Sequence, residues 1–346
     1  MRISVTERQT YKRCRRKWHY SSYNRLSLSP IVNAPALDLG TLIHATLAQW
    51  TDEPTLDPVA LYTELSLSYF QNIISMYTAS VGCKPSEEEL MPTAEAISLG
   101  SKMIANYQIK WRTPLPPGFT LVQNELSLVQ PVPGTEHCGC LETNLRAEPD
   151  SGTWGCHSLT MDCAYCGAIC ECPPYCHVCT TTYHELECTF DGIMADANGD
   201  LYIIERKTFS RTPNIEELQN NDQFLAYQWA LSQVKPNVVG VAYDGLLKKP
   251  SPRGVHKSLD DLFLRRLLLR PEAELAEFGS LLALEINEMA DPTVPIYKTV
   301  PPVMGCQKWE CSFINVCQAQ SKGYPTDDLL KMFTRSDRKS HLEIET

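Results

Sequence analysis

The first part of the chain shows apolar residues at helical spacing. Ser4 with Glu7, and Thr6 with Gln9, have the separation of a capping box. The apolar positions that follow recur every three or four residues and are Tyr11, Cys14 and Trp18. The pattern predicts a helix with one apolar stripe and basic residues on its other faces.

A second helical pattern begins after Asp38. It has an apolar face, next to His44, that consists of Leu39, Ile43 and Leu47. Helical patterns continue over about 58–78 and 87–112, until three prolines and a glycine between positions 114 and 118 interrupt the chain. The sequence therefore predicts a helical N-terminal part.

The second half of the chain mixes strand and helix patterns. Residues 119–130 predict a strand, and 188–195 and 201–208 predict two more, which flank an Asn-Gly pair at position 198. Asn-Gly between two apolar runs is a strong signal for a β-hairpin. After the hairpin we expect a helix over 214–234, a strand over 238–247 and a long helical stretch from about 258 to 290.

The length of the hairpin loop decides which residues of its two strands face each other. With a two-residue loop, Asp191 lies opposite Arg206. With a three-residue loop that ends at Gly199 in the left-handed region, Asp191 lies opposite Glu205, and Lys207 shares their face. We predict the three-residue loop or an equivalent bulge.

Two carboxylates on one face of a sheet can hold Mg²⁺ or Mn²⁺ through their oxygens. Lys207 would then position the attacking water or offset charge that develops on a phosphate. The alternative is a solvated surface pair of Glu205 and Lys207, worth under about 1 kcal/mol. The Asp…Glu-x-Lys pattern alone does not decide between the two.

Residues 131–188 differ in composition from the rest of the chain. They contain ten cysteines and four histidines but few large aliphatic residues, so they cannot build an ordinary hydrophobic core. Two C-x-x-C pairs predict a zinc site formed by Cys163, Cys166, Cys176 and Cys179. A second site would draw on Cys138, Cys140, Cys156, His157, Cys170 or Cys172. A cysteine-rich loop with no fixed metal is the alternative.

Composition and charge narrow the class of protein. The chain has 346 residues, 43% of them hydrophobic and 21% charged, which is typical of a soluble globular protein. It has neither an 18-residue apolar run nor a signal-peptide core, so we expect a cytoplasmic protein without membrane association. Because thiols stay reduced there, its fifteen cysteines favour metal ligation over disulfides.

The charges are unevenly distributed around a net charge of −10. Residues 1–30 carry eight Lys and Arg against one Glu, whereas 131–190 carry one Arg against eight acidic residues. We expect the basic helix over 8–17 to guide a phosphate backbone. The acidic, cysteine-rich insertion is suited instead to docking a protein partner.

Several motifs occur in a recognisable order: Cys14 in a basic helix, 40-GTLIH-44, Asp191, 204-IERKT-208, Gln223 with Tyr227, and 306-CQKWECSFINVC-317. Together they resemble the PD-(D/E)XK nuclease superfamily, in the RecB-like branch that includes CRISPR-associated adaptation nucleases, AddAB-type nuclease domains and many phage exonucleases. The resemblance implies an α/β fold, with a restriction-endonuclease-like core in which helices flank a central mixed β-sheet.

The resemblance also implies the roles of single residues. The catalytic cation would be held by His44, Asp191, Glu205 and the carbonyl of Arg206, with Lys207 serving the attacking water. Gln223 and Tyr227 would support that lysine or touch DNA, and Glu125 is a candidate near the metal. Relatives often have a glycine shortly before the active-site aspartate, where this chain has Cys188 and Thr189, so Asp196 remains the fallback ligand.

A second cofactor is implied by four cysteines near the two chain ends. In the family resembled, one N-terminal and three C-terminal cysteines hold a 4Fe-4S cluster, and the matching residues are Cys14, Cys306, Cys311 and Cys317. The spacing of the first C-terminal pair is C-x4-C where relatives have C-x-x-C. Zinc at the same four sulfurs is the alternative, and simple buried cysteines come third.

The sequence thus predicts a metal-dependent DNA nuclease, more an exonuclease on DNA ends or single strands than an endonuclease, in a bacterial or phage-infected cell. It contains no Walker-type motif, so a role as nuclease subunit of a helicase-nuclease would require a partner. A non-catalytic zinc-stapled binding module is the alternative class. We divide the chain into a helical part with the first core strand, the insertion, the core with the cysteine motif, and a polar tail: 1–130, 131–188, 189–320 and 321–346.

Overall fold

The computed structural model describes residues 1–30, 35–135, 181–248, 258–297, 306 and 311–335, with three short pieces at 137–138, 161–162 and 169–170. The chain forms two compact units, each built from three separate segments. The first unit comprises Met1–Ser27, Val129–Glu187 and Ala273–Pro325, and the second Leu28–Leu128, Cys188–Glu272 and Thr326–Thr346. No helix in the described segments is long and apolar enough to span a membrane.

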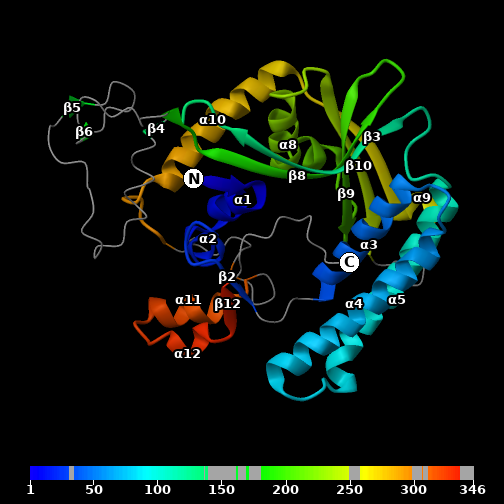
Figure 1. The fold of residues 1–346 in the computed structure, drawn as a ribbon, viewed down its shortest axis with the longest axis horizontal. Helices are drawn as coiled ribbons and strands as arrows, with labels where there is room; N and C mark the ends of the chain where they lie inside the picture. Colours follow the sequence, from blue (N-terminus) through cyan, green and yellow to red (C-terminus); the bar gives the residue numbers. More distant parts are fainter. Residues whose placement is uncertain are drawn as a thin grey trace. The chain divides into compact units, whose positions relative to one another are not determined.

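A mixed β-sheet is the centre of the second unit (Figure 1). Strand β9 pairs in parallel with β10 and antiparallel with β8, while β11 pairs antiparallel with β10 and β3 pairs with β8. The bounds are β3 Thr120–Pro131, β8 Glu185–Ala195, β9 Leu201–Phe209, β10 Val238–Leu247 and β11 Phe263–Leu269. The predicted α/β class with a central mixed sheet is confirmed.

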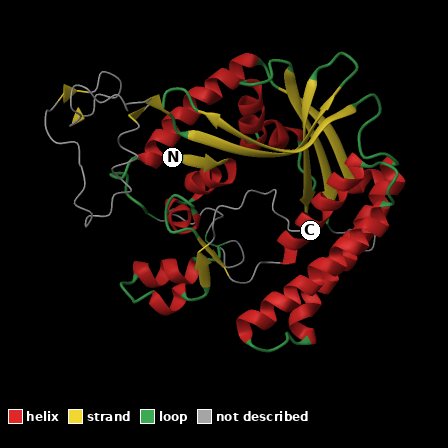
Figure 2. Cartoon of the chain, viewed as in Figure 1, coloured by secondary structure: helices red, strands yellow, loops and turns green. Residues whose placement is uncertain are grey.

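Helices cover both faces of this sheet (Figure 2). The long helices α3 (Pro35–Asp52), α4 (Pro58–Val81) and α5 (Glu87–Trp111) form one apolar core, whose buried members include Leu246 of β10. On the opposite face, α8 (Asp222–Ser232) packs Phe224 against Tyr243, with ring centroids 5.7 Å apart. Since side chains alternate along a strand, Leu246 and Tyr243 point to different faces.

The β8–β9 hairpin has the predicted three-residue loop. Gly192 lies opposite Ile204, and the Asp196 N–H donates to the Asp200 carbonyl at 3.1 Å, which leaves residues 197–199 in the loop. Gly199 has φ +87°, a conformation that L side chains rarely adopt. The odd loop length was the condition for Asp191 and Glu205 to share a face, and it is met.

The first unit packs the N-terminal helices against α10. These elements are β1 Arg2–Ser4, α1 Val5–Arg13, α2 Arg15–Ser21, α10 Glu272–Ala290 and α11 Ile314–Ser321. Ser4 and Glu7 form the predicted capping box of α1, but the expected single helix is broken at Cys14, which is extended and caps α2. β1 pairs in parallel with the first residues of β8.

Basic residues of the first unit are largely engaged inside it. Arg8 is fully buried, pairs with Glu285 of α10 and lies 4.8 Å from the ring centroid of Phe278. Arg15 pairs with Glu288 on the same helix. The expectation that residues 8–17 guide DNA is therefore wrong for Arg8, because a guanidinium without exposed surface cannot meet a phosphate.

Two other predicted elements are wrong. The stretch 258–290 is not one helix: a four-residue helix α9 (Leu259–Leu262) leads into β11, and Pro271 precedes α10. Sheet pairing with β10 outweighs the helical spacing of the leucines in β11. The predicted helix 214–234 is split into α7 (Ile215–Gln219) and α8, because the Asn221 side chain caps the start of α8.

Shorter elements complete the described fold. In the second unit β2 (Leu28–Pro30) pairs with β12 (Phe333–Arg335), after α12 (Asp327–Leu330). In the insertion two short ladders pair β4 (His137–Cys138) with β7 (Thr181–Thr182) and β5 (Met161–Asp162) with β6 (Ile169–Cys170). The predicted zinc ligands Cys163, Cys166, Cys176 and Cys179 lie outside the described residues.

Candidate active site

Asp191 is held by contacts from two different elements. Its Oδ1 lies 3.1 Å from Nδ1 of His44 on α3, and its Oδ2 accepts a hydrogen bond of 2.6 Å from the Arg206 backbone N–H on β9. Burial alone would raise the pKa of Asp191, but the charge and hydrogen bond of His44, with those of Arg206, lower it to about 2. Asp191 is therefore an anion at neutral pH.

His44 is affected in the opposite sense. Burial opposes its charged form, yet the Asp191 charge and hydrogen bond, helped by Glu205, outweigh burial and raise the pKa of His44. The helix α3 brings this ring to the sheet because Leu39, Ile43 and Leu47 are buried in the helical core beside it. The apolar residues of α3 thus pack in the core, while His44 on the same helix contacts Asp191.

Glu205 is the most buried acid of the site, with 2% of its surface exposed. Its Oε1 lies 2.5 Å from Lys207 Nζ and accepts a hydrogen bond of 3.3 Å from Gln223 Nε2. Burial and the negative charge of Asp191 raise the pKa of Glu205 to about 7, against the lowering effect of Lys207. The pKa values of the two carboxyl groups therefore differ by several units, as is common at functional sites that bind a cation or transfer a proton.

Lys207 stays charged beside Glu205. Burial disfavours the ammonium, but the negative charges of Glu205 and Asp191 raise its pKa above the ordinary value. Its side chain is 39% exposed, so one end of the ion pair reaches the surface. Lys207 is thus placed between the buried carboxylate and a molecule arriving from solvent.

Helix α8 contributes Gln223 and Tyr227, which are four residues apart on one helical face. The Gln223 amide donates to Glu205 and also to the Tyr227 hydroxyl at 2.7 Å. Burial and the nearby Glu205 charge raise the pKa of Tyr227, so its hydroxyl stays protonated. The Asn221 side chain caps α8 by accepting hydrogen bonds from the backbone N–H groups of Gln223 and Phe224.

A cavity of about 340 Å³ opens next to Asp191. Residues from α3, β3, β8 and α8 line it, among them His44, Glu125, Asp191 and Tyr227. Glu125 has φ +39°, in the left-handed region that a glutamate rarely occupies. Such strain tends to persist only where the surrounding structure or a function requires it.

The backbone and the side chain of Arg206 have different hydrogen-bond partners. Its backbone N–H faces Asp191, whereas its buried side chain lies on the face toward α3 and donates from Nη2 to Thr51 Oγ1 at 2.7 Å. It stands opposite Asp244 in the parallel ladder of β9 and β10. Asp196, the fallback ligand, instead accepts hydrogen bonds from the backbone of Asn198 and Asp200 within the hairpin loop.

The donor set suits a divalent cation in its chemistry. Carboxylate oxygens are the ligands that Mg²⁺ and Mn²⁺ prefer, whereas an imidazole is more usual at softer metals. Within the described residues, no three His, Cys, Asp or Glu side chains are arranged to hold a metal as they stand. Asp191 is paired with His44 and Glu205 with Lys207, so binding a cation would require these side chains to exchange their present partners.

Near the chain ends, the described thiols Cys14, Cys306, Cys311 and Cys317 all belong to the first unit. Burial raises the pKa of Cys311, and the neighbouring Cys14 and Cys306 thiols raise it further. Arg16 Nη1 lies 3.6 Å from Cys317 Sγ. Cys14 and Cys306 thus lie near enough to Cys311 to affect its ionisation, and within the described residues these thiols do not form a ready metal site.

The sequence patterns missed a buried polar group in the second unit. Tyr107, Asp244 and Arg265 are hydrogen-bonded to one another on the sheet face that carries the Arg206 side chain. The available signal was Asp244 itself, a charged residue in the middle of the apolar run of β10.

The family model described as the PD-(D/E)XK nuclease superfamily matches residues 2–318, which is nearly the whole chain. No curated protein matches the chain. The chain therefore belongs to the PD-(D/E)XK nuclease superfamily, and its α/β architecture with a mixed sheet flanked by helices is consistent with the restriction-endonuclease-like fold of that superfamily.

Proposed function

We propose that this member of the PD-(D/E)XK nuclease superfamily is a metal-dependent deoxyribonuclease of the RecB-like branch, acting as an exonuclease on DNA ends or single strands. The observation that carries the proposal is the shared face of Asp191 and Glu205 across the odd-length hairpin, with Lys207 Nζ 2.5 Å from Glu205. A solvated surface pair would not be buried at one end, as Glu205 is.

His44, Asp191, Glu205 and the carbonyl of Arg206 would hold the cation. When bound, Mg²⁺ or Mn²⁺ supplies Lewis-acid stabilisation of the phosphate and makes a water molecule a better nucleophile. Lys207 orients that water and offsets the charge that develops on the phosphate oxygens. Its exposed end and its contact with Glu205 suit it to act between carboxylate and substrate.

The remaining residues position this machinery. Gln223 donates to Glu205 and leaves the Tyr227 hydroxyl proton available toward the cavity beside Asp191. Before a cation binds, His44 Nδ1 contacts Asp191, which keeps the carboxylate at the Arg206 N–H. Glu125, strained at the wall of the cavity, would support the residues that hold the cation.

We also propose that Cys14, Cys306, Cys311 and Cys317 hold a structural 4Fe-4S cluster, supported by the place of all four thiols in the first unit and by the effect of Cys14 and Cys306 on the pKa of Cys311. Thiolate ligation by four cysteines is what such a cluster requires. Anaerobic purification tests this directly. Brown protein that contains iron and acid-labile sulfide would support the cluster. Colourless protein with stoichiometric zinc would show a zinc site at these cysteines instead.

The acidic insertion is proposed to bind zinc and to dock a protein partner. Eight acidic residues against one arginine over 131–190 make it a poor DNA contact. Deleting residues 139–180 should lower the zinc content and spare cleavage of bare DNA. Loss of cleavage as complete as that caused by Asp191→Ala would contradict the docking role.

The nuclease proposal is tested with end-labelled linear single- and double-stranded DNA and with covalently closed circular DNA, in Mg²⁺ or Mn²⁺. We expect metal-dependent loss of the linear substrates and survival of the circle. Lys207→Ala should lower the rate by about 10²- to 10⁴-fold, whereas Lys331→Ala, at a lysine 77% exposed at the C-cap of α12, should not change it. Rapid nicking of the circle would make the enzyme an endonuclease, and equal rates for both variants would reject the site.

A further inference from the structure

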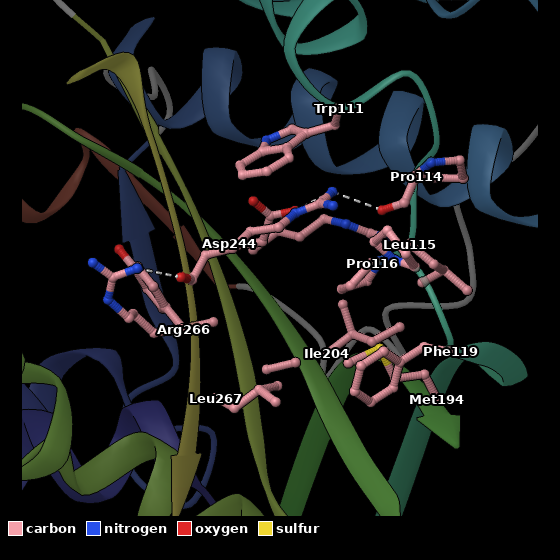
Figure 3. A pocket seen from close by; sticks show the side chains of 15 residues that line it. Trp111, Pro114, Leu115, Pro116, Phe119, Met194, Ile204, Asp244, Arg266 and Leu267 are labelled. Carbon is pink, nitrogen blue, oxygen red and sulfur yellow. Dashed lines mark hydrogen bonds and ion pairs between the residues drawn. The ribbon is translucent and has the colours of Figure 1, made fainter. Parts of the chain in front are cut away.

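The Arg206 side chain is a buried charge next to the candidate active site. Arg206 lies between Glu205 and Lys207 on β9 and is 1% exposed, and because side chains alternate along a strand it points to the opposite face of the sheet from its two neighbours. Asp244 stands opposite it on β10. Both side chains line a cavity of about 230 Å³ on this face, where Figure 3 shows Asp244 below Trp111. The guanidinium is therefore held away from solvent, on the face that does not carry Glu205.

Asp244 is engaged mainly by other residues. Its Oδ2 accepts hydrogen bonds from Arg265 Nε, at 3.0 Å, and from the Tyr107 hydroxyl. Arg206 Nε has no hydrogen-bond partner among the described residues, whereas Arg206 Nη2 donates to Thr51 Oγ1 at 2.7 Å. A buried guanidinium with an unmet donor lowers the stability of the folded state. Stability alone therefore does not explain an arginine at this position.

Thr51 connects Arg206 to the helix that carries His44. It lies on α3, about two turns after His44, and is 3% exposed. Nearer the start of α3, a Cβ built on Gly40 would lie 3.8 Å from Thr208 Oγ1, so the helix also approaches β9 closely there. His44 lies between these two points along the helix. The two contacts of α3 with β9 thus determine how far His44 is from the sheet.

We propose that Thr51 and the Arg206 guanidinium are positioning residues for the cation site. Their hydrogen bond holds the peptide group of Arg206, whose N–H donates to Asp191 at 2.6 Å. It also keeps α3 where His44 Nδ1 lies 3.1 Å from the same carboxylate. This role rests on the proposed function, in which these residues hold the cation. Replacing residues that orient metal ligands in this way commonly weakens metal binding by about 10- to 100-fold.

Thr51→Val tests the role, with Thr46→Val as its matched control. Both threonines are buried on α3 and donate to a backbone carbonyl, that of Leu47 at 2.5 Å and that of Leu42 at 2.8 Å, but Thr51 also accepts from Arg206. Isothermal titration calorimetry measures Mn²⁺ binding to the full chain without DNA. We expect Thr51→Val to weaken it by about 10- to 100-fold and Thr46→Val to leave it unchanged. Equal affinities of the two variants would overturn the role.

Hydrogen exchange of the Arg206 amide measures the position of the peptide group itself, without metal and without DNA. In protein labelled with ¹⁵N-arginine and followed by NMR, we expect this amide to exchange several-fold faster in Thr51→Val than in wild type, while the other arginine amides keep their rates. Equal acceleration at all arginine amides, or an unchanged rate at Arg206, would overturn the role. Absence of Mn²⁺ binding or of DNA cleavage in wild type would instead reject the proposed function and leave this measurement unaffected.

Arg206→Met removes the guanidinium and keeps the peptide group. Asp244 retains its hydrogen bonds from Arg265 and Tyr107, so we expect the thermal midpoint to change little while Mn²⁺ affinity falls as in Thr51→Val. A large drop in thermal midpoint with unchanged Mn²⁺ affinity would make Arg206 a purely structural residue. If Arg206→Met does not fold, the comparison of Thr51→Val with Thr46→Val still decides.

Discussion

The Arg206 backbone N–H donates to the Asp191 carboxylate at 2.6 Å, while the Arg206 side chain is buried on the other face of the sheet. One residue therefore supports the candidate active site with its backbone and binds Thr51 on the other face with its guanidinium. This arrangement depends on the three-residue hairpin loop, because a two-residue loop would turn Asp191 to the opposite face.

The raised pKa of Glu205 predicts how stability depends on pH without metal. Its ordinary pKa is 4.5 and its folded value is about 7, so between these values the folded protein holds a proton that the unfolded chain has lost. The wild type must then lose stability as pH rises through this window. Glu205→Gln has no ionisable group at this position. We therefore expect the free energy of unfolding of the variant, minus that of wild type, to increase by about 1–3 kcal/mol from about pH 5 to about pH 8.

Urea unfolding of both proteins in EDTA measures this difference. A constant difference between the two pH values would mean that Glu205 ionises normally in the fold. Because a carboxylate must lose its proton to bind a cation, the same shift predicts that the affinity of wild type for Mn²⁺ rises with pH up to about 7.

Gln223 should act by positioning Glu205 and Tyr227. Gln223→Ala removes both hydrogen bonds, and we expect kcat to fall by about 10-fold or more with little change in the thermal midpoint. Gln233→Ala is a matched control near the other end of α8, where the amide meets only Trp229 and Ser232. Equal kcat values in the two variants would remove Gln223 from the site.

Relieving the backbone strain at Glu125 should change stability and activity in opposite directions. Glu125→Gly relieves a left-handed backbone and should stabilise the fold by up to about 1 kcal/mol while activity falls. Arg112 has φ +58° at the exposed C-terminal cap of α5, so Arg112→Gly should stabilise the fold similarly and keep activity. Thermal unfolding and DNA cleavage measured on both variants check this. Full activity of Glu125→Gly would mean that the strain has no role in the site.

Arg8 should contribute to the stability of the fold and not to DNA binding. Arg8→Ala removes the buried partner of Glu285, which keeps Lys12 at 3.3 Å, and we expect a loss of about 1–3 kcal/mol in the free energy of unfolding. Arg2 forms an exposed pair with Glu185, so Arg2→Ala should cost under about 1 kcal/mol. Chemical denaturation of both variants measures the contrast. A stable Arg8→Ala protein with weakened DNA binding would restore the sequence-based expectation for this residue.

The sequence was sufficient where local rules and face alternation agree. The Asn198-Gly199 signal and the requirement that Asp191 meet Glu205 together predicted the hairpin and its register, and both are confirmed. The strand 238–247 was also predicted with its correct bounds. These features depend on short-range backbone chemistry.

The failures come from long-range pairing and packing. The leucines of β11 have helical spacing, and only their partner β10 makes them a strand. The burial of Arg8 depends on α10, which lies far along the chain. The link between Tyr107 and Asp244 joins residues 137 apart, a contact that no local pattern contains.

The most direct test of the central claim compares Asp191→Asn with Asp196→Asn in metal-dependent cleavage of end-labelled DNA. Asn at position 191 keeps an acceptor for the Arg206 N–H but loses the charge that would hold the cation, whereas Asn at 196 still caps the hairpin loop. We predict a loss of at least about 100-fold for Asp191→Asn and near wild-type rates for Asp196→Asn. Wild-type cleavage by Asp191→Asn, with loss in Asp196→Asn, would contradict the account.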